Sequence, residues 1–134
     1  MTGDVWARYP HAIRGEYGDS EALCEHLVDL ICAGTKTATC GALRDYEAEG
    51  SAIPAPGDIE IVLHWDDTPA AVVEMTDVTV QPFHAVTEDF ALAEGENDSH
   101  AGWATGHRAY FERTGGWSPD LMLVCQRFKL IEVL

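Results

Sequence analysis

Hydrophobic residues recur at helical spacing in the stretch that follows residue 20. One predicted helix face has the spacing i, i+4, i+7, i+8 and consists of Leu23, Leu27, Leu30 and Ile31. Asp19 or Ser20 precedes this run and can cap the first free amides, and Gly34 follows it as a residue suited to end a helix. The pattern predicts one amphipathic helix, which delivers the chain to Lys36.

Alternating hydrophobic residues predict a β-hairpin in the middle of the chain. A loop rich in proline and glycine over residues 50–58 leads into the first strand. That strand would place on one face Ile59, Ile61, Leu63 and Trp65. A turn over 66–69 joins it to a second strand over 70–80, which is rich in Val and Thr and is expected to bend near Asp77.

Two further helices are predicted in the second half of the chain. Thr87 can cap a short helix over 88–94, which Gly95 would stop. A longer helix is expected to begin at Asp98 or Ser99 and to end at the glycine pair 115–116. The face of that helix carries Trp103, His107, Tyr110, Phe111 and Thr114.

The apolar, β-branched run over 121–133 predicts a central strand that is buried on both faces in its first half. Residues 1–18 are expected to be packed but irregular, because Pro10 interrupts any long helix there. Helices and strands do not alternate regularly, so the order of elements favours the α+β class. We expect a small bent sheet or β-barrel with helices packed on the outside, in a single domain over 1–134.

The charge of the chain narrows the class of partner. It has 23 acidic and 8 basic side chains, a net charge of -15, which repels a phosphate backbone and argues against DNA or long RNA. Small or weakly charged substrates fit better, although the charge can equally serve solubility alone. No apolar stretch approaches the ~20 residues that span a bilayer, and the N-terminus lacks signal-peptide features, so we expect a cytoplasmic protein without a membrane partner.

The cysteines show no metal-binding spacing. Cys24, Cys32, Cys40 and Cys125 contain no Cys-x-x-Cys pair, and the six histidines add no closely spaced ligands. Reduced thiols in or beside the core are therefore expected, with no metal and no other cofactor.

Lys36, Thr39 and Glu94 are the candidates for catalysis. Lys36 is one of two lysines and stands three positions before Thr39, so its amine could act as base to a nucleophilic hydroxyl. Glu94 is expected in the last turn of its helix, where the dipole disfavours an anion and would raise the carboxyl pKa. The alternatives are a solvated lysine on a polar loop and a solvated acidic loop, since Glu96 follows closely.

Four segments, read together, resemble ASCH-domain proteins, which belong to the PUA-like β-barrel group. They are Gly34–Thr39, Pro56–Asp58, Val86–Glu96 and Cys125–Phe128. The resemblance extends over nearly the whole chain. The family includes small bacterial amidohydrolases that remove the acyl group from N(4)-acetylcytidine with a lysine, a threonine three residues later and a glutamate after the barrel hairpin.

The resemblance implies that Lys36, Thr39 and Glu94 fill those three roles. A desolvated Lys36 of lowered pKa would accept the Thr39 proton, an acyl-threonine would form, and Glu94 would pass a proton to the departing amine. Backbone amides in the turn after Gly34 would stabilise the oxyanion. Many family members place an arginine shortly after the threonine; Cys40 and Gly41 occupy that place here, and Arg44 is the nearest substitute. In this respect the chain resembles the longer ASCH subfamily, whose relatives have been assigned RNA binding or RNA cleavage.

Four residues are candidates for holding a nucleoside. Trp103 or Trp65 could stack on a base, and His107 or Arg44 could donate hydrogen bonds to a base edge or sugar. For Trp103 and His107, packing in the core of an amphipathic helix is the alternative. Two other functions stay open: an RNA-binding or RNA-cleaving module, which fold analogy supports, and a non-enzymatic regulator that holds a small ligand.

Overall fold

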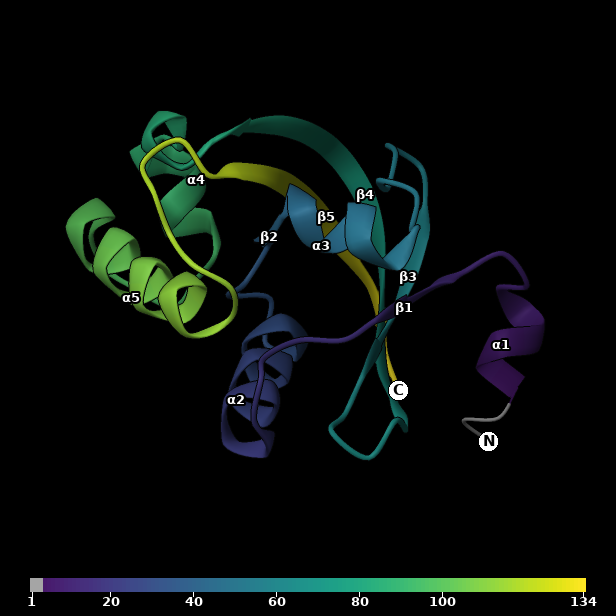
Figure 1. Ribbon diagram of the computed structural model, residues 1–134. Coiled ribbons are helices and arrows are strands. Elements are labelled where there is room, and N and C mark those ends of the chain that lie inside the picture. Colours follow the sequence, from purple (N-terminus) through teal and green to yellow (C-terminus); the bar gives the residue numbers. More distant parts are fainter. Residues whose placement is uncertain (1–3) are drawn as a thin grey trace.

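A curled sheet of five strands forms the centre of the computed structural model, which describes residues 4–134 (Figure 1). The strands are β1 (Ile13–Gly15), β2 (Ala38–Ala42), β3 (Ile59–Leu63), β4 (Pro69–Pro82) and β5 (Met122–Val133). Their order is β1-β3-β4-β5-β2; β1 is parallel to β3, and the other neighbours are antiparallel. The sheet is a half-barrel of mixed strands with helices around it, which confirms the α+β prediction.

The predicted hairpin is the β3–β4 pair. Its strands are antiparallel, and β4 starts at Pro69, directly after the predicted turn. The register between β4 and β5 shifts between Met75 and Asp77, where a bend was expected. β5 lies between β4 and β2, and its first half is buried on both faces as predicted. The two long strands, β4 and β5, curve together around the interior (Figure 1).

The three predicted helices are present with their caps. They are α2 (Glu21–Cys32), α4 (Glu88–Ala93) and α5 (His100–Arg113). Ser20, Thr87 and Ser99 are the respective N-caps, and each side chain accepts a hydrogen bond from the backbone amide three residues later. Helix starts were therefore encoded locally in the sequence.

The structure corrects the sequence-based prediction in four places, the first of which is strand β2, which was not predicted. Residues 4–18 are not irregular throughout, because α1 (Val5–Arg8) precedes strand β1; residues 1–3 lie outside the described part. Helix α3 (Leu43–Glu49) was missed, since its N-cap Ala42 makes no capping bond and none of its residues is buried. Trp65 lies in the turn beyond β3 rather than on the strand. A short 3-10 helix, Phe83–Ala85, links β4 to α4.

Two apolar clusters flank a polar space inside the curl. One packs α2 against β3, β4 and β5 through residues such as Val28, Val62 and Phe128. The other packs α4 and α5 against β2 and β5, with Trp103 at 0% exposure.

All four cysteines are free thiols, as expected. Over residues 4–134, none of the helices has the length and apolarity to cross a membrane.

Candidate functional site

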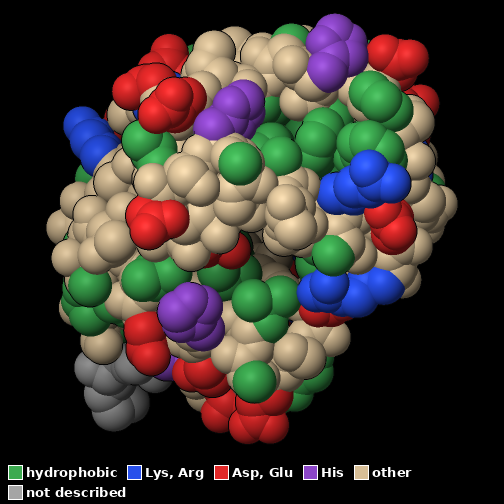
Figure 2. Space-filling model, turned by 90° about the vertical axis from the view of Figure 1, so that its left-hand side faces the viewer, with side chains coloured by type: hydrophobic (Ala, Val, Ile, Leu, Met, Phe, Trp, Pro, Cys, Tyr) green, Lys and Arg blue, Asp and Glu red, His purple; other side chains and the backbone are tan. Residues whose placement is uncertain are grey.

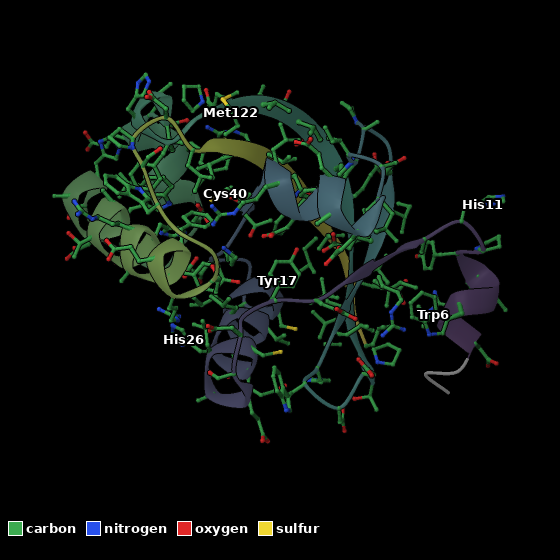
Figure 3. The ribbon with its side chains drawn as sticks, in the orientation of Figure 1. Trp6, His11, Tyr17, His26, Cys40 and Met122 are labelled. Atoms are coloured by element: carbon green, nitrogen blue, oxygen red, sulfur yellow. The ribbon has the colours of Figure 1, made fainter. Side chains whose placement is uncertain are left out.

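A cavity of about 740 Å³ lies between the curled sheet and the helices. Its wall includes residues of β1, α2, β2, α3, β3, α5 and β5, so distant segments of the chain meet there. The face of the molecule seen in Figure 2 is hollowed near its centre, and acidic side chains are visible in the hollow. Figure 3 shows Tyr17 and Cys40 within the space that the sheet and helices enclose.

The backbone before β2 brings Lys36 to the end of α4. The amide of Thr37 donates to the carbonyl of Ala93 at 2.9 Å, and the Thr37 carbonyl accepts from Phe128 of β5 at 3.0 Å. Gly95 has φ +76°, and a Cβ at that position would lie 2.6 Å from the carbonyl oxygen of Thr35. Glycine at 95 therefore permits both the left-handed turn and the close approach of the two segments.

Lys36 and Glu94 form a buried ion pair where these segments meet. The Lys36 amine donates to Glu94 Oε1 at 3.1 Å and to Glu96 Oε2 at 2.9 Å, with a longer contact of 3.4 Å to the Glu94 carbonyl. The side chains of Lys36 and Glu94 are each 1% exposed, and that of Glu96 is 19% exposed. An amine and a carboxylate removed from water at this depth depend on each other for compensation.

The charges of this pair contradict two pKa predictions. Burial alone would lower the pKa of Lys36, but the negative charges of Glu94 and Glu96 outweigh it and raise that pKa. Burial alone would raise the pKa of Glu94, but the Lys36 charge and the bonds from His107 and Trp103 lower it to about 2. At neutral pH the resting site therefore holds an ammonium and a carboxylate, not the neutral amine and proton-loaded acid expected from the sequence.

Two residues of α5 fix the second oxygen of Glu94. Trp103 Nε1 donates to Oε2 at 2.6 Å, and His107 Nε2 lies 3.4 Å from the same atom. The His107 ring stacks on the Trp103 indole with 4.5 Å between centroids, and its Nδ1 is 2.9 Å from the Trp103 carbonyl. Trp103 is thus a buried positioning residue with its indole N–H on the candidate acid, while His107 also reaches the cavity wall.

Thr39 lies on the cavity wall but not in the ion pair. It stands on β2 opposite Gln126 of β5, is half-buried, and lines the same cavity as Lys36 and Glu94. Within residues 4–134 its hydroxyl has no hydrogen-bond partner, so the bond from hydroxyl to base that the sequence suggests is not formed in the resting site. Thr37, by contrast, donates its hydroxyl to the Ala93 carbonyl at 3.3 Å.

The turn after Gly34 does not supply an oxyanion hole. The amides of Thr35 and Lys36 donate to the Leu30 carbonyl at 3.0 and 3.1 Å, and that of Thr37 donates to Ala93. These amides close the end of α2 and join it to α4, so that part of the predicted chemistry is wrong. Other donors must face a developing oxyanion.

Arg44 and Trp65 lie away from the cavity wall. The Arg44 guanidinium is against Gly115 and Gly116, and its buried Nη2 has no hydrogen-bond partner among residues 4–134. Trp65 is 50% exposed and borders a smaller neighbouring hollow that shares Tyr17 with the cavity. Neither side chain is therefore placed to hold a ligand in the cavity.

Several polar residues of the cavity were not singled out from the sequence. Besides Glu96, they are Tyr17, Tyr46, Glu60 and Gln126. Glu60 was detectable in principle, because a charged residue interrupts the apolar run of β3 between Ile59 and Ile61. The others carry no local signal, since exposed polar residues of the same types are common.

Cys40, Glu94 and His107 could together hold a metal ion, because one ligand atom from each lies within 4.8 Å of the others. The Cys40 thiol also contacts Glu94 Oε2 at 3.4 Å. Burial is the main cause that raises the Cys40 pKa well above its ordinary value, which opposes formation of the thiolate that a metal requires. The Lys36 ammonium already compensates the Glu94 carboxylate, so these three residues are a poor fit for a metal ion.

Comparison with known proteins supports the family resemblance. A family model described as "ASCH domain" matches residues 14–132. A crystal structure of an ASCH domain from Lactobacillus crispatus JV V101 is 31% identical, with a TM-score of 0.81, over 97% of this chain and 86% of that one. A crystal structure of a protein from Enterococcus faecalis V583 is 28% identical, with a TM-score of 0.83, over 98% and 85% of the two chains. Among curated proteins, no significant match was found.

Proposed function

The chain belongs to the ASCH domain family, and on that premise we propose that it is an amidohydrolase for an N-acylated pyrimidine nucleoside such as N(4)-acetylcytidine. One observation carries the proposal. The Lys36–Glu94 ion pair, withdrawn from water, lies on the wall of a large cavity that Thr39 also lines. Titratable groups with perturbed pKa values in a concave site are candidates for acid–base chemistry.

The charge state of the pair requires a proton shift before the reaction. A bound, largely uncharged substrate would displace water and favour the neutral form of the pair, so a proton would move from Lys36 to Glu94 across 3.1 Å. The resulting amine accepts the Thr39 hydroxyl proton while the hydroxyl oxygen attacks the amide carbon. The new Lys36 ammonium then stabilises the oxyanion.

The remaining steps release the two products and restore the resting protonation state. Glu94 gives its proton to the departing nitrogen of the base, which leaves an acyl-threonine and a carboxylate. That carboxylate takes a proton from water as the water oxygen attacks the ester carbon. Collapse releases the carboxylic acid and the Thr39 oxygen, which regains its proton from Lys36. As the products leave, the proton that Glu94 took from water moves to Lys36 and restores the ion pair. No cofactor enters the sequence.

The test is release of cytidine from N(4)-acetylcytidine by the purified protein, followed by chromatography. We expect turnover in the wild type and a loss of at least about 1,000-fold in Thr39→Val, since removing a nucleophile abolishes the covalent route. Thr79→Val is the matched control, because Thr79 is an exposed threonine on β4 and its loss is expected to leave turnover unchanged. A Thr39→Val variant with normal turnover would refute the nucleophile.

A second candidate is a regulator that binds a nucleoside without turnover. It is favoured by the ionised state of Lys36 and by the missing hydrogen bond between Lys36 and Thr39. This function predicts saturable binding of N(4)-acetylcytidine by calorimetry with no cytidine released after prolonged incubation.

The cationic side chains do not favour the RNA-facing alternative. Six of the eight form ion pairs with carboxylates: Arg8, Arg14, Lys36, Arg108, Arg113 and Arg127. Arg44 packs its guanidinium against the glycine pair of residues 115 and 116. A gel-shift and cleavage assay with RNA at low salt would reveal any such activity, because electrostatic binding is strongest there.

A further inference from the structure

Glu60 is a second buried carboxyl on the cavity wall, and the proposed reaction does not use it. It stands on β3, between Ile13 of β1 and Val73 of β4 in register, and is 6% exposed. Gly15 makes room for it, since a Cβ at that position would lie 2.4 Å from Glu60 Oε1. A glycine on the neighbouring strand thus allows the carboxyl to occupy this place.

One hydrogen bond holds Glu60, and it engages one of the two carboxyl oxygens. Tyr17 donates its hydroxyl to Oε1 at 2.5 Å. Among residues 4–134, Oε2 has no hydrogen-bond partner, and it is not among the side-chain atoms that are both fully enclosed and unpaired. Oε2 therefore faces the cavity, where a group from a ligand can reach it.

Two neighbouring residues on the cavity wall present further free polar atoms. Gln126, which is 4% exposed, donates its amide to Tyr46 Oη at 2.9 Å. The Tyr46 hydroxyl proton and the Gln126 amide oxygen have no partner within the described chain. The wall thus offers acceptors at Glu60 and Gln126 and a donor at Tyr46.

The charge of the wall restricts the ligand. Six acidic side chains line the cavity: Glu16, Asp45, Glu49, Glu60, Glu94 and Glu96. Three cationic ones line it, namely Arg14, Lys36 and Arg113, and each is paired with a carboxylate. A phosphorylated ligand would meet repulsion here, whereas hydroxyl groups find acceptors.

We propose that Glu60 is a specificity-determining residue that accepts hydrogen bonds from the sugar hydroxyls of an unphosphorylated nucleoside, with Tyr17 holding the carboxyl in place. The proposal rests on the proposed function, because it assumes that the amide of the substrate lies at Lys36 and Glu94. A carboxylate oxygen has two lone pairs, so Oε2 can accept from both hydroxyls of a ribose diol while Oε1 stays with Tyr17. Bonds of this kind would also offset the cost of ionising Glu60, whose pKa burial raises to about 7.

The test measures binding of cytidine, cytosine and cytidine monophosphate by calorimetry. We expect the wild type to bind cytidine at least 10-fold more tightly than either of the others. In Glu60→Gln, Tyr17 would bind the remaining oxygen and the amide N–H2 would face the sugar, so the preference for cytidine over cytosine is expected to fall below about 3-fold. Glu47→Gln, which removes an exposed acid from α3, is the control and should keep the wild-type ratio.

A second measurement keeps the proposal open to refutation if Glu60→Gln does not fold. Wild-type protein should bind 2′,3′-dideoxycytidine at least 10-fold more weakly than cytidine, and equal affinities would overturn the assignment. An unchanged cytidine-to-cytosine ratio in folded Glu60→Gln would overturn it too. No binding of any nucleoside would overturn both this inference and the proposed function. Binding with the expected ratios but without deacylation of N(4)-acetylcytidine would remove the proposed reaction and leave the Glu60 assignment supported.

Discussion

Glu94 and Glu60 line the same cavity and are buried to a similar extent, but their pKa values are shifted in opposite directions. Glu94 is 1% and Glu60 6% exposed, yet the pKa of Glu94 is lowered to about 2 and that of Glu60 is raised to about 7. Burial disfavours the carboxylate at both sites. At Glu94 the Lys36 ammonium and two α5 donors reverse that effect, whereas at Glu60 the single bond from Tyr17 does not. The charged partner, rather than the depth, decides the protonation state.

Removing the Lys36 cation is expected to have the largest effect on the difference between Glu94 and Glu60. Lys36→Met should destabilise the fold by about 3–5 kcal/mol, because it leaves a buried carboxylate uncompensated, and it should raise the pKa of Glu94. Urea unfolding followed by circular dichroism measures the effect. The double variant Lys36→Met/Glu94→Gln should recover part of the loss. If the single variant unfolds at the wild-type urea concentration, Lys36 is not the group that keeps Glu94 ionised in the folded protein.

The pH dependence of stability should separate the two glutamates. The raised pKa of Glu60 means that the folded state binds more protons than the unfolded state between pH 4.5 and about 7. Its contribution, up to about 3 kcal/mol, is complete below pH 4.5 and is lost as the pH rises through 7. Glu94 acts in the opposite direction: its contribution is present above pH 4.5 and is lost as the pH falls towards 2.

Glu60→Gln should therefore abolish the decrease in stability between pH 4.5 and 7 and keep the acid decrease due to Glu94. Denaturation midpoints of both proteins across pH 3 to 8 provide the measurement. Parallel curves for wild type and variant over the whole range would show that Glu60 ionises as an exposed carboxyl does.

Trp103→Phe tests the α5 side of the contrast with a smaller change. The substitution keeps an aromatic ring against Phe83 but removes the indole donor to Glu94 Oε2 at 2.6 Å. Loss of a hydrogen bond to a charged group should cost about 2 kcal/mol, and part of the steric fit is lost as well. Thermal and urea unfolding measure this cost. Turnover of N(4)-acetylcytidine should fall along with it, whereas full turnover would mean that Trp103 does not position the acid.

An exposed ion pair supplies the smallest expected effect. Arg14 Nη2 lies 3.2 Å from Asp67 Oδ1, and the two side chains are 53% and 67% exposed. Asp67→Asn suits the positive φ of this position and removes the charge, so stability should change by less than about 0.5 kcal/mol. A loss of stability as large as that of Lys36→Met would mean that an exposed ion pair contributes as much as a buried one in this protein.

Local signals predicted much of the fold. The caps at Ser20, Thr87 and Ser99 and the spacing of apolar residues in α2 act within one or two helical turns, so they are readable in the sequence. By contrast, β1 has three residues and depends on pairing with β3, and α3 has neither a side-chain cap nor a buried residue. Such elements carry too few local constraints to be recognised.

The candidate site was predicted in part for the same reason. The motif around Lys36 and the helix that ends at Glu94 are short segments whose resemblance to the family is visible, and the structure brings Lys36, Thr39, Glu94 and His107 to one cavity wall. Arg44 was selected as the nearest substitute for the family's arginine and Trp65 by residue type, and both face other parts of the molecule. Residue type says what a side chain can do, but not which wall it faces.

The sequence by itself determined the ASCH family, the α+β class and the capped helices, and it predicted Lys36, Thr39 and Glu94 as candidate residues. Only the tertiary structure decided the charge of those residues and the side chains that they contact. Lys36 meets Glu94 across 58 positions, and Tyr17 meets Glu60 across 43. Electrostatic interactions depend on distance in space and on the exclusion of water, and neither quantity exists until distant segments have packed together.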